Sequence, residues 1–523
     1  MKKTLKNIIL GTCLALAPVL FSSRAYAAQE FIRGDVDGDG KITLTDPVQT
    51  LNYLFRGGQK PDCEDAMDVN DDGKVDLGDA VYELRHSFQG GTPPATPFPL
   101  KGYDHTRDEL DCNGQRDLER IVKISGKDLP YRIEEGGTEN EPLLVLLDEN
   151  GASDHTGLTI AADDVVFDGQ NHEIRYGLDG KNDVYGIHID HGKRVSIKNV
   201  RIVEGSSSGV NKYGMYLLWT EGTDISDFEV STSSIASSAI HIFYGNSHTI
   251  RNGKMQTGGD SADVLHTTLS NLDQISDSYL KATGNNAKIF FLSGDGNTLS
   301  HVTGESTGEG GDGIELNRAN KNTISESTLQ SNGNCLVISR STSNSFFKDD
   351  FQSSGINSDC VYFSFSPTDS NTFSDSTFNA QDPGYNDVRF SSFSSGTSDF
   401  THVELANKKI SFDPFPDSQK MPQARFFWYV NAEIKDKDQH PIEHVNVQAH
   451  YQNPNEPSPL FSVYSDIEGR IQQQTLLGSV HDANGVEYSS YDFTASHPDY
   501  NNPATFHLDE IDGNIDWKAT LRN

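Results

Sequence analysis

The chain has 523 residues, with 76 Asp and Glu against 42 Lys and Arg, which gives a formal net charge of −34 at pH 7. A surface this acidic repels nucleic acid and anionic membranes, and it favours metal cations. The length allows several domains. Charge therefore argues against a nucleic-acid-binding protein or a protein of the membrane surface.

The first residues have the features of a secretory signal peptide, which we expect over residues 1–27. Lys2, Lys3 and Lys6 precede an apolar run from Ile8 to Phe21, and Ala25, Tyr26 and Ala27 provide a cleavage site of the A-x-A type. The run is too short to span a bilayer, so we expect no membrane insertion. Removal of this segment, with its four cationic residues, would take the net charge from −34 to −38. We therefore expect a secreted, periplasmic or cell-surface protein.

Two acidic segments offset by 33 residues have the ligand spacing of a calcium loop. They read DVDGDGKITLTD from Asp35 and DVNDDGKVDLGD from Asp68, with Gly at the sixth position for the sharp turn. Oxygen ligands at this spacing are what a hard cation needs. The predicted Ca²⁺ ligands are Asp35, Asp37, Asp39, Lys41, Thr43 and Asp46, then Asp68, Asn70, Asp72, Lys74, Asp76 and Asp79, with both lysines contributing backbone carbonyl oxygens.

An apolar helix is predicted after each loop, over residues 47–55 and 80–88, and each ends near a Gly-Gly pair. Asp46 is the expected N-cap of the first helix, with Pro47 at its first position. The duplicated loop and helix, over residues 34–91, resembles a type I dockerin. In dockerins the tenth and eleventh loop positions recognise cohesin; here they are Leu44 with Thr45 and Leu77 with Gly78, so the usual polar pair is missing. A cohesin-like partner is implied by the resemblance, and the sequence leaves it open.

Residues 92–100, rich in proline, are predicted to be a stiff spacer. The next long segment, residues 101–412, repeats a short alternating pattern every 22 to 28 residues, as in GIHID from Gly186, GMYLL from Gly214 and GIELN from Gly313. Alternation with a period of two indicates strands, and a repeat of this length indicates a stack of coils. The fold class is therefore mainly β: a parallel β-helix of about ten coils, preceded by a capping segment.

The frame from Thr159 to Ile174, with the repeats that follow, resembles the right-handed β-helix family of copper-maturation-type and carbohydrate-binding or sugar-hydrolysis repeats. That resemblance is informative for fold more than for function, because enzymes, adhesins and plain scaffolds share it. After a second predicted linker, residues 413–424, the segment 425–523 resembles an Ig-like, carboxypeptidase-regulatory-like β-sandwich through IKDKDQHPIEHVNV and SDIEGRI.

In each repeat the second and fourth residues should face the core, so the third and fifth should face solvent. The third residues form one outer row, His188, Tyr216, His241, His266, Phe291, Glu315, Val337, Tyr362 and Arg389, and the fifth include Asp190, Leu218, Phe243 and Asn317. Tyr216, His241, His266 and Glu315 are the candidate catalytic residues. His188, Asp190, Phe243, Phe291 and Asn317 are the candidate substrate-binding residues.

A polysaccharide is the expected partner of this row, because aromatic faces accept sugar rings and His or Tyr can transfer a proton. A lyase or epimerase fits better than a glycoside hydrolase, which needs two carboxylates about 5 to 9.5 Å apart. The alternative is a ladder of stacked side chains on a secreted adhesion, scaffold or carbohydrate-binding protein without catalysis. The sequence does not choose between them.

Four cysteines follow the signal peptide. A disulfide between Cys63 and Cys112 is plausible in an oxidising compartment. Cys335 and Cys360 occupy the same place in successive coils, so they form either a bridge or a stacked pair of thiols.

Overall fold

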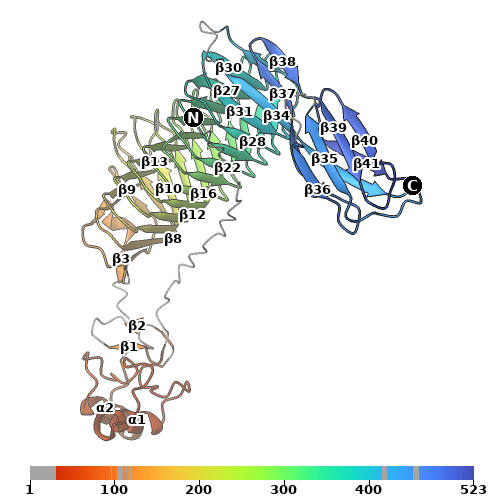
Figure 1. The fold of residues 1–523 in the computed structure, drawn as a ribbon. Helices are drawn as coiled ribbons and strands as arrows, with labels where there is room; N and C mark the ends of the chain where they lie inside the picture. The colour runs from red at the N-terminus through yellow and green to blue at the C-terminus, as the bar shows by residue number, and fades with distance from the viewer. Residues whose placement is uncertain are drawn as a thin grey trace, which may run out of the picture. The chain divides into compact units, whose positions relative to one another are not determined.

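The chain forms two compact units, residues 1–119 and residues 120–523, in a computed structural model (Figure 1). The structure describes residues 31–95, 97–99, 101–102, 110–112, 115–116, 121–139, 141–414, 421–451 and 459–522. The predicted signal peptide lies outside the described residues. No helix in the described part of the chain is long and apolar enough to cross a membrane.

The N-terminal unit contains the two predicted helices, α1 (Thr45–Arg56) and α2 (Leu77–Gln89), and a short hairpin of β1 (Asp111–Cys112) and β2 (Gln115–Arg116). Each helix ends at a glycine in the left-handed conformation, Gly57 at φ 66° and Gly90 at φ 64°, as a C-terminal cap requires. The expected N-cap of the first helix is wrong: Leu44 occupies that position. The Asp46 carboxylate instead accepts hydrogen bonds from the loop, at Val36 N (2.9 Å) and Thr43 N (2.8 Å).

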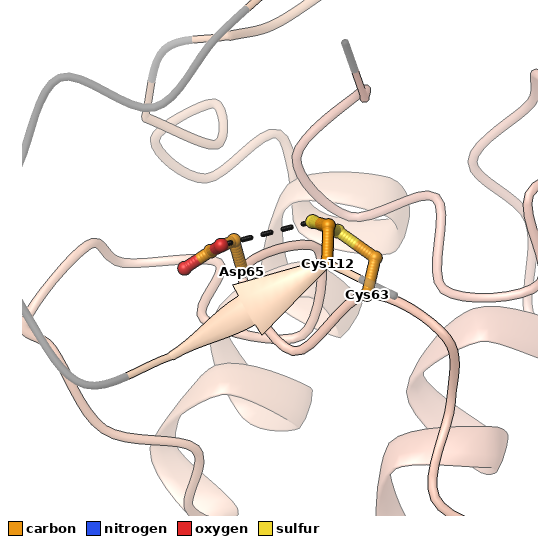
Figure 2. A group of neighbouring side chains, drawn as sticks. All are labelled: Cys63, Asp65 and Cys112. Carbon is orange, nitrogen blue, oxygen red and sulfur yellow. Dashed lines mark hydrogen bonds between the residues drawn. A yellow bond between two sulfur atoms is a disulfide. The ribbon is translucent and has the colours of Figure 1, made fainter. Parts of the chain in front are cut away.

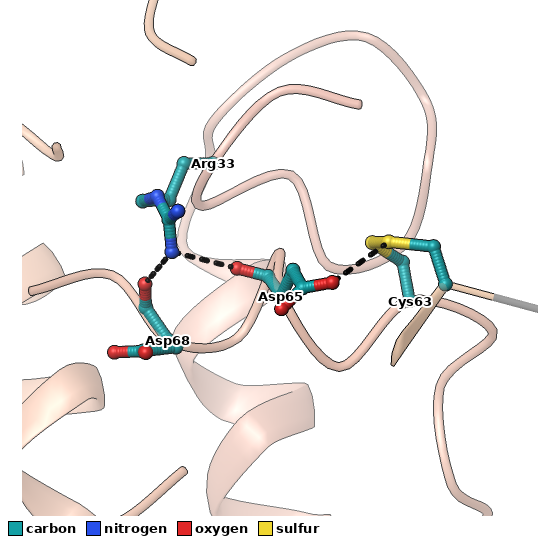
Figure 3. The surroundings of a disulfide bond; sticks show 5 residues. Arg33, Cys63, Asp65 and Asp68 are labelled. Carbon is teal, nitrogen blue, oxygen red and sulfur yellow. Dashed lines mark hydrogen bonds between the residues drawn. A yellow bond between two sulfur atoms is a disulfide. The ribbon is translucent and has the colours of Figure 1, made fainter. Parts of the chain in front are cut away.

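A disulfide joins Cys63, in the turn between the helices, to Cys112 in β1 (Figure 2). Asp65 lies beside this bridge, with its Oδ2 3.7 Å from the Cys112 sulfur. The buried guanidinium of Arg33 donates hydrogen bonds to the carbonyl oxygens of Asp65 (3.3 Å) and Asp68 (2.6 Å) (Figure 3). The bridge therefore fastens the segment after the proline-rich run to the duplicated module.

The proline-rich run is part of the N-terminal unit and does not behave as the predicted spacer. Ala95 N donates to Val69 O (3.2 Å), and Arg33 N donates to Pro97 O (2.7 Å). Pro94 and Pro97 are buried. The run packs on the module because its carbonyl groups and apolar rings find partners there.

The second unit is a parallel β-solenoid, as the repeat predicts. One face is a 12-stranded sheet in which each strand pairs with the strands of the coils before and after it, so the solenoid has about twelve coils where the sequence indicated about ten. Its strands are β4 (Tyr131–Ile133), β7 (Leu158–Ile160), β9 (Ile187–Asp190), β11 (Met215–Leu218), β13 (Ile240–Phe243), β15 (Leu265–Thr268), β18 (Phe290–Ser293), β21 (Ile314–Asn317), β24 (Leu336–Ser339), β27 (Val361–Phe365), β30 (Val388–Phe393) and β33 (Ile410–Phe412).

The other faces of the coils carry the remaining solenoid strands, again paired in parallel from coil to coil (Figure 1). A short 3-10 helix, Gly126–Asp128, lies in the first coil. The strands are β3 (Ile121–Ile124), β5 (Leu143–Leu147), β6 (Gly151–Ala152), β8 (Val165–Tyr176), β10 (Ser196–Glu204), β12 (Asp224–Thr232), β14 (Thr249–Thr257), β16 (Gln274–Ser276), β17 (Tyr279–Ala282), β19 (Thr298–Ser300), β20 (Thr303–Ser306), β22 (Thr323–Ser325), β23 (Thr328–Ser331), β25 (Ser345–Phe347), β26 (Asp350–Ser353), β28 (Thr372–Ser374), β29 (Thr377–Ala380), β31 (Thr397–Thr401) and β32 (Glu404–Leu405).

The solenoid core consists of apolar side chains stacked in register. Phe346, Phe373, Phe400 and Phe426 stack with ring centroids 4.5 to 4.9 Å apart. Cys335 and Cys360 are buried free thiols in this core, so the stacked pair is the observed alternative.

A second internal ladder is polar and runs through one turn of the coils. The side-chain oxygens of Asp273, Asn297, Asn322, Asn344 and Asn371 each accept from the backbone N–H one coil earlier, at 2.7 to 3.1 Å. All five residues are buried. Buried turn N–H groups are thereby satisfied, which a stack of tight turns requires.

The solenoid continues into the C-terminal strands without a break in pairing. The first half of β34 (Gln423–Lys435) pairs in parallel with β31, and its second half pairs with β41 (Ile515–Thr520). Gln423 and Ala424, predicted as linker, already belong to this strand. β37 (Gln474–Asp482) and β38 (Gly485–Tyr488) extend the same sheet.

A separate four-stranded antiparallel sheet contains β35 (Asn446–Tyr451), β36 (Phe461–Tyr464), β39 (Tyr491–Ser496) and β40 (Ala504–Leu508). Residues of this sheet and of the sheet that continues the solenoid share a second apolar core.

Candidate functional site

The outer row predicted from the repeat lies on the 12-stranded sheet, one residue per coil. We call its nine members, from His188 to Arg389, the histidine row. The pairing places Tyr216 beside His188, His241 beside Tyr216, and His266 beside His241. Phe291 and Glu315 follow in β18 and β21. In the five-residue repeat pattern, which begins one residue before each of these strands, the second and fourth residues are buried and the third and fifth are partly exposed, so the predicted alternation is confirmed.

The row is less open to solvent than its sequence position suggests, because a second set of side chains packs beside it. Tyr185 contacts His188 and Tyr216 at ring-centroid distances of 5.1 and 4.8 Å, and Tyr213 lies 4.5 Å from His241. Each of these neighbours lies three positions before a member of the histidine row, as do Asp263, Lys288 and Asp312. We call this set, Tyr185, Tyr213, Asp263, Lys288 and Asp312, the flanking row.

Ring faces in the histidine row are largely covered by the next coil. His266 stacks on Phe291 at 4.5 Å with an interplanar angle of 16°, and His188 stacks on Tyr216 at 5.2 Å and 17°. His241 and His266 are 4.6 Å apart. Outside the row, the exposed Trp219 stacks on Tyr244 at 4.1 Å and 4°. A ligand would therefore meet ring edges and polar atoms rather than the open aromatic faces expected from the sequence.

His266 is the member of the row with the best-defined hydrogen bonds. Its Nδ1 lies 2.9 Å from Oδ2 of Asp263, and its Nε2 lies 3.2 Å from Oγ1 of Thr268. Asp263 is buried. A carboxylate on one ring nitrogen fixes the orientation of the imidazole and stabilises its protonated form. This is the arrangement of a proton acceptor.

His241 and His188 are in a different state. Burial, with the neighbouring His266, lowers the pKa of His241 to about 3, so its imidazole is neutral near pH 7. Burial also lowers the pKa of His188, and its Nε2 has no hydrogen-bond partner among the described residues. Burial raises the pKa of Tyr216, and the carboxylate of Asp190 adds to that effect. The phenol therefore stays protonated and can donate a hydrogen bond.

Lys288 brings a cation to the row that the sequence analysis did not include. Its Nζ lies 3.5 Å from Oε2 of Glu315. Burial alone would lower the pKa of this lysine, but the carboxylates of Asp263, Glu315 and Asp312 outweigh burial and raise the pKa. Asn317 donates to the other oxygen of Glu315 at 3.2 Å. Burial raises the pKa of Asp312 to about 6.

The remaining candidates lie on the same strands but in other contacts. Asp190 accepts from the His191 ring at 2.6 Å, and Phe243 packs edge-on against Tyr244.

The flanking row could have been found in the sequence, because its members occupy the same position in successive repeats: Tyr185, Tyr213, Asp263, Lys288 and Asp312. Alternation alone did not identify them, since they precede the strands.

The two calcium loops bring their carboxylates together in the N-terminal unit. One oxygen from each of Asp35, Asp37 and Asp39 lies within 4.8 Å of the other two. Oδ2 of Asp35 accepts from Gly40 N at 2.9 Å, while its buried Oδ1 has no hydrogen-bond partner among the described residues. Convergent carboxylates with an unpaired buried oxygen fit a hard cation such as Ca²⁺.

The second loop repeats the main-chain hydrogen bonds of the first. Oδ2 of Asp68 accepts from Gly73 N at 2.8 Å, and Asp79 accepts from the N–H groups of Asp76 (2.8 Å) and Asn70 (3.4 Å). Burial raises the pKa of Asp79 to about 6, and the neighbouring Asp68 and Asp72 add to this. A bound cation would compensate these crowded charges. Asp76 also caps α2, accepting from Gly78 N.

Residues 33–82 match the dockerin type I domain family. This segment is therefore similar to a dockerin type I domain. Dockerins of this type bind calcium, which agrees with the ligand spacing of both loops. The family match covers this segment alone, and a comparison with curated proteins found no match to the chain.

The dockerin carries three pairs of exposed apolar side chains related by the 33-residue repeat. They are Leu44 and Leu77, Val48 and Val81, and Phe55 and Phe88. The polar recognition pair expected of dockerins is thus replaced by an apolar surface that occurs twice.

Solved structures with a similar fold are β-helix proteins at low identity. The Azotobacter vinelandii mannuronan C-5 epimerase AlgE4 A-module is 9% identical, with a TM-score of 0.37, covering 55% of this chain and 100% of that one. DFA-IIIase from Arthrobacter chlorophenolicus A6, without its lid, is 9% identical, with a TM-score of 0.35, covering 58% and 87%. A tailspike protein double mutant of E. coli bacteriophage HK620, in complex with a pentasaccharide, is 7% identical, with a TM-score of 0.35, covering 75% and 85%.

Proposed function

We propose that this is a secreted calcium-binding protein whose solenoid binds an extracellular polysaccharide along the histidine row. The observation that carries the proposal is the concentration of polar groups on six successive coils, from His188 in β9 to Glu315 in β21. Later coils are plainer, with Val337 buried in the same row. A linear polymer lying along the stack would meet one rung about every 4.8 Å.

The row also supports a reaction that begins with proton abstraction. His266 is the proton acceptor, because Asp263 orients its ring and stabilises the imidazolium that forms. Lys288, beside Glu315, would face the carboxylate of a uronate residue and weaken the C5–H bond of that sugar. In a lyase, the electron pair of the C5–H bond forms the C4–C5 double bond as the C4–O bond breaks, and the departing oxygen takes a proton from water. In an epimerase, the C5 carbanion takes a proton on its other face.

The other candidates have supporting roles in this proposal. Neutral His241 hydrogen-bonds the substrate, since a group with a pKa of about 3 is a poor base near pH 7. Tyr216 lies two rungs from His266, a spacing of roughly 10 Å, so it contacts a neighbouring sugar residue. His188, Asp190, Phe243, Phe291 and Asn317 line the binding surface, and Glu315 holds Lys288 or a Ca²⁺ ion.

A non-catalytic carbohydrate-binding, adhesion or scaffold protein is the second candidate. The observation that favours it is the stacking of ring faces, which is also how a purely structural ladder is built. Incubation with alginate, polygalacturonate and xylan, with and without calcium, separates the two. The catalytic form of the proposal expects unsaturated or epimerised product from a uronate polymer, lost in His266→Ala and kept in Tyr362→Phe. Binding of a polymer without any product favours the second candidate.

The proposal also covers the N-terminal module, the C-terminal strands and the predicted signal peptide. The apolar pairs on α1 and α2 suit a cohesin-like partner with an apolar surface, and a pull-down with the Phe55→Ser and Phe88→Ser double variant tests this. The C-terminal strands suit an Ig-like, carboxypeptidase-regulatory-like module, and the signal peptide suits export.

A further inference from the structure

A cavity of about 620 Å³ lies within the second unit, where the last solenoid coils meet the C-terminal sheet. Its walls include Asp375, His402 and Glu404 from the solenoid, and Trp428, His481 and Tyr488 from β34, β37 and β38. Volumes of this size are typical of small-molecule sites. The histidine row contributes nothing to this cavity, so the cavity is a separate feature of the molecule.

The walls are held together by continuous pairing. β34 pairs with solenoid strand β31 over Gln423–Phe427 and then with β37 and β41. Tyr429 in the same strand donates from its hydroxyl to Oδ2 of Asp375 at 3.0 Å. The two sides are thus one structural body, and a ligand site between them would be preformed.

Asp375 orients a histidine on the solenoid side. Its Oδ1 lies 2.8 Å from Nδ1 of His402, so one carboxylate holds both His402 and Tyr429. Nδ1 is occupied, which leaves Nε2 of His402 for a ligand. Across the cavity, burial lowers the pKa of His481, and this ring is neutral near pH 7.

Trp428 supplies an aromatic side chain to the cavity wall. Its Nε1 is buried and has no hydrogen-bond partner among the described residues. A Cβ atom at Gly478 would lie 2.8 Å from that nitrogen, so the glycine lets the indole lie close against the backbone. The Nε1 edge of the indole therefore faces the protein, and the remaining surface of the ring borders the cavity.

We propose that this cavity binds a neutral saccharide of one or a few sugar residues. Sugar hydroxyls donate to the carboxylates of Glu404 and Asp512, which line the wall. Apolar faces of Trp428 and Tyr488 suit the C–H surface of a sugar ring. These carboxylates repel a uronate, so the ligand differs in charge from the substrate proposed for the histidine row. The protein would then hold neutral saccharides at one place and act on an acidic polymer at another.

Isothermal titration calorimetry on the full-length protein with cellobiose, xylobiose, mannobiose and lactose tests the cavity. We expect at least one disaccharide to bind, with about tenfold weaker binding in Trp428→Phe, which loses the larger aromatic face of the indole. Glu404→Gln, an exposed position that leaves the fold unchanged, should weaken binding by a similar factor. The matched control is Trp219→Phe, the same change at an exposed tryptophan on the other surface.

Three outcomes would overturn the inference: no disaccharide binds; binding is unchanged in both Trp428→Phe and Glu404→Gln; or the cavity variants lose binding of a polyamine such as spermidine and of no sugar. A negative result with the cavity variants does not bear on the histidine row, because that row is tested by Tyr216→Ala and His266→Ala. The two proposals therefore fail independently.

Discussion

His266 and Asp263 form a dyad, with Nδ1 of the imidazole 2.9 Å from Oδ2 of the buried carboxylate. Asp263 precedes β15 and His266 lies within it, so the turn and the strand of one coil together build the pair. No other histidine of the histidine row has an ion-pair partner among the described residues. The proposed chemistry therefore centres on this coil.

The dyad predicts a specific effect of Asp263→Asn. The amide cannot stabilise the imidazolium, so we expect turnover of a uronate polymer to fall at least tenfold with a smaller change in KM. Asp227→Asn, the same change on another face, is the control. Equal turnover in the two variants would remove the dyad from the mechanism.

The alternation of the repeat predicts opposite results at two adjacent residues. Leu265 is fully buried and His266 is partly exposed. Leu265→Asp places an unpaired carboxylate in the core and should lower the free energy of unfolding by several kcal/mol, whereas His266→Ala should lower it by about 1 kcal/mol. Chemical denaturation of both variants measures this. Similar losses would mean that the two side chains are not on opposite faces.

The polar ladder predicts a gain in stability from Asp273→Asn. Burial raises the pKa of Asp273 to about 6 from 3.8, so the folded state holds the proton more tightly than the unfolded state. The protonated carboxyl group of Asp273 stabilises the folded state fully at pH values below its unfolded pKa of 3.8. This contribution is lost as the pH rises through about 6. At pH 8 the ionised carboxylate then costs on the order of 3 kcal/mol.

Asparagine removes that cost and keeps the bonds, since its oxygen can accept from His248 N and its amide can donate to Ser270, the two present partners. Asn297, Asn322, Asn344 and Asn371 already occupy the following rungs. We expect a higher Tm for the variant at pH 8 and a difference that shrinks toward pH 4. A Tm difference independent of pH would contradict this origin.

Calcium should control the folding of the dockerin. Its loops crowd Asp35, Asp37 and Asp39 in one place and Asp68 and Asp79 in another, and without a cation these charges oppose folding. Excess EDTA should abolish the thermal transition of the dockerin in the full-length protein and leave that of the solenoid. Asp35→Ala with Asp68→Ala should act like EDTA. An unchanged transition in EDTA would exclude calcium as a structural ligand.

Much of the fold follows from the sequence because its signals are local and repeated. The 33-residue offset of the acidic loops and the alternation in each coil determine the module and the solenoid, including which side of β15 is buried. The N-cap at Asp46 was wrong because a carboxylate can cap a helix or close the preceding loop, and only the folded loop decides between them. The proline-rich run packs on the module and does not form the predicted spacer, because composition does not show hydrogen bonds such as the one from Arg33 N to Pro97 O.

The candidate site was predicted less completely. The histidine row follows from the repeat, but its open ring faces do not exist, because rungs one strand apart bring rings such as His266 and Phe291 into stacking distance. Lys288 and Asp263 belong to the turn before each strand, and their approach to the row depends on side-chain direction. The cavity at Trp428 joins segments about 50 residues apart, and no local pattern indicates it.

The central claim is that the histidine row binds the polysaccharide. Calorimetric titration of the full-length protein with alginate and polygalacturonate, in calcium, tests it most directly through the double variant Tyr216→Ala and His266→Ala. Both side chains are partly exposed, so Tm should change little. We predict that the double variant loses at least tenfold in affinity for the polymer that the unaltered protein binds, while Tyr362→Ala, on the plainer coils, keeps it. Unchanged affinity in the double variant, with loss in Tyr362→Ala, would contradict the claim and move the site toward the C-terminal coils.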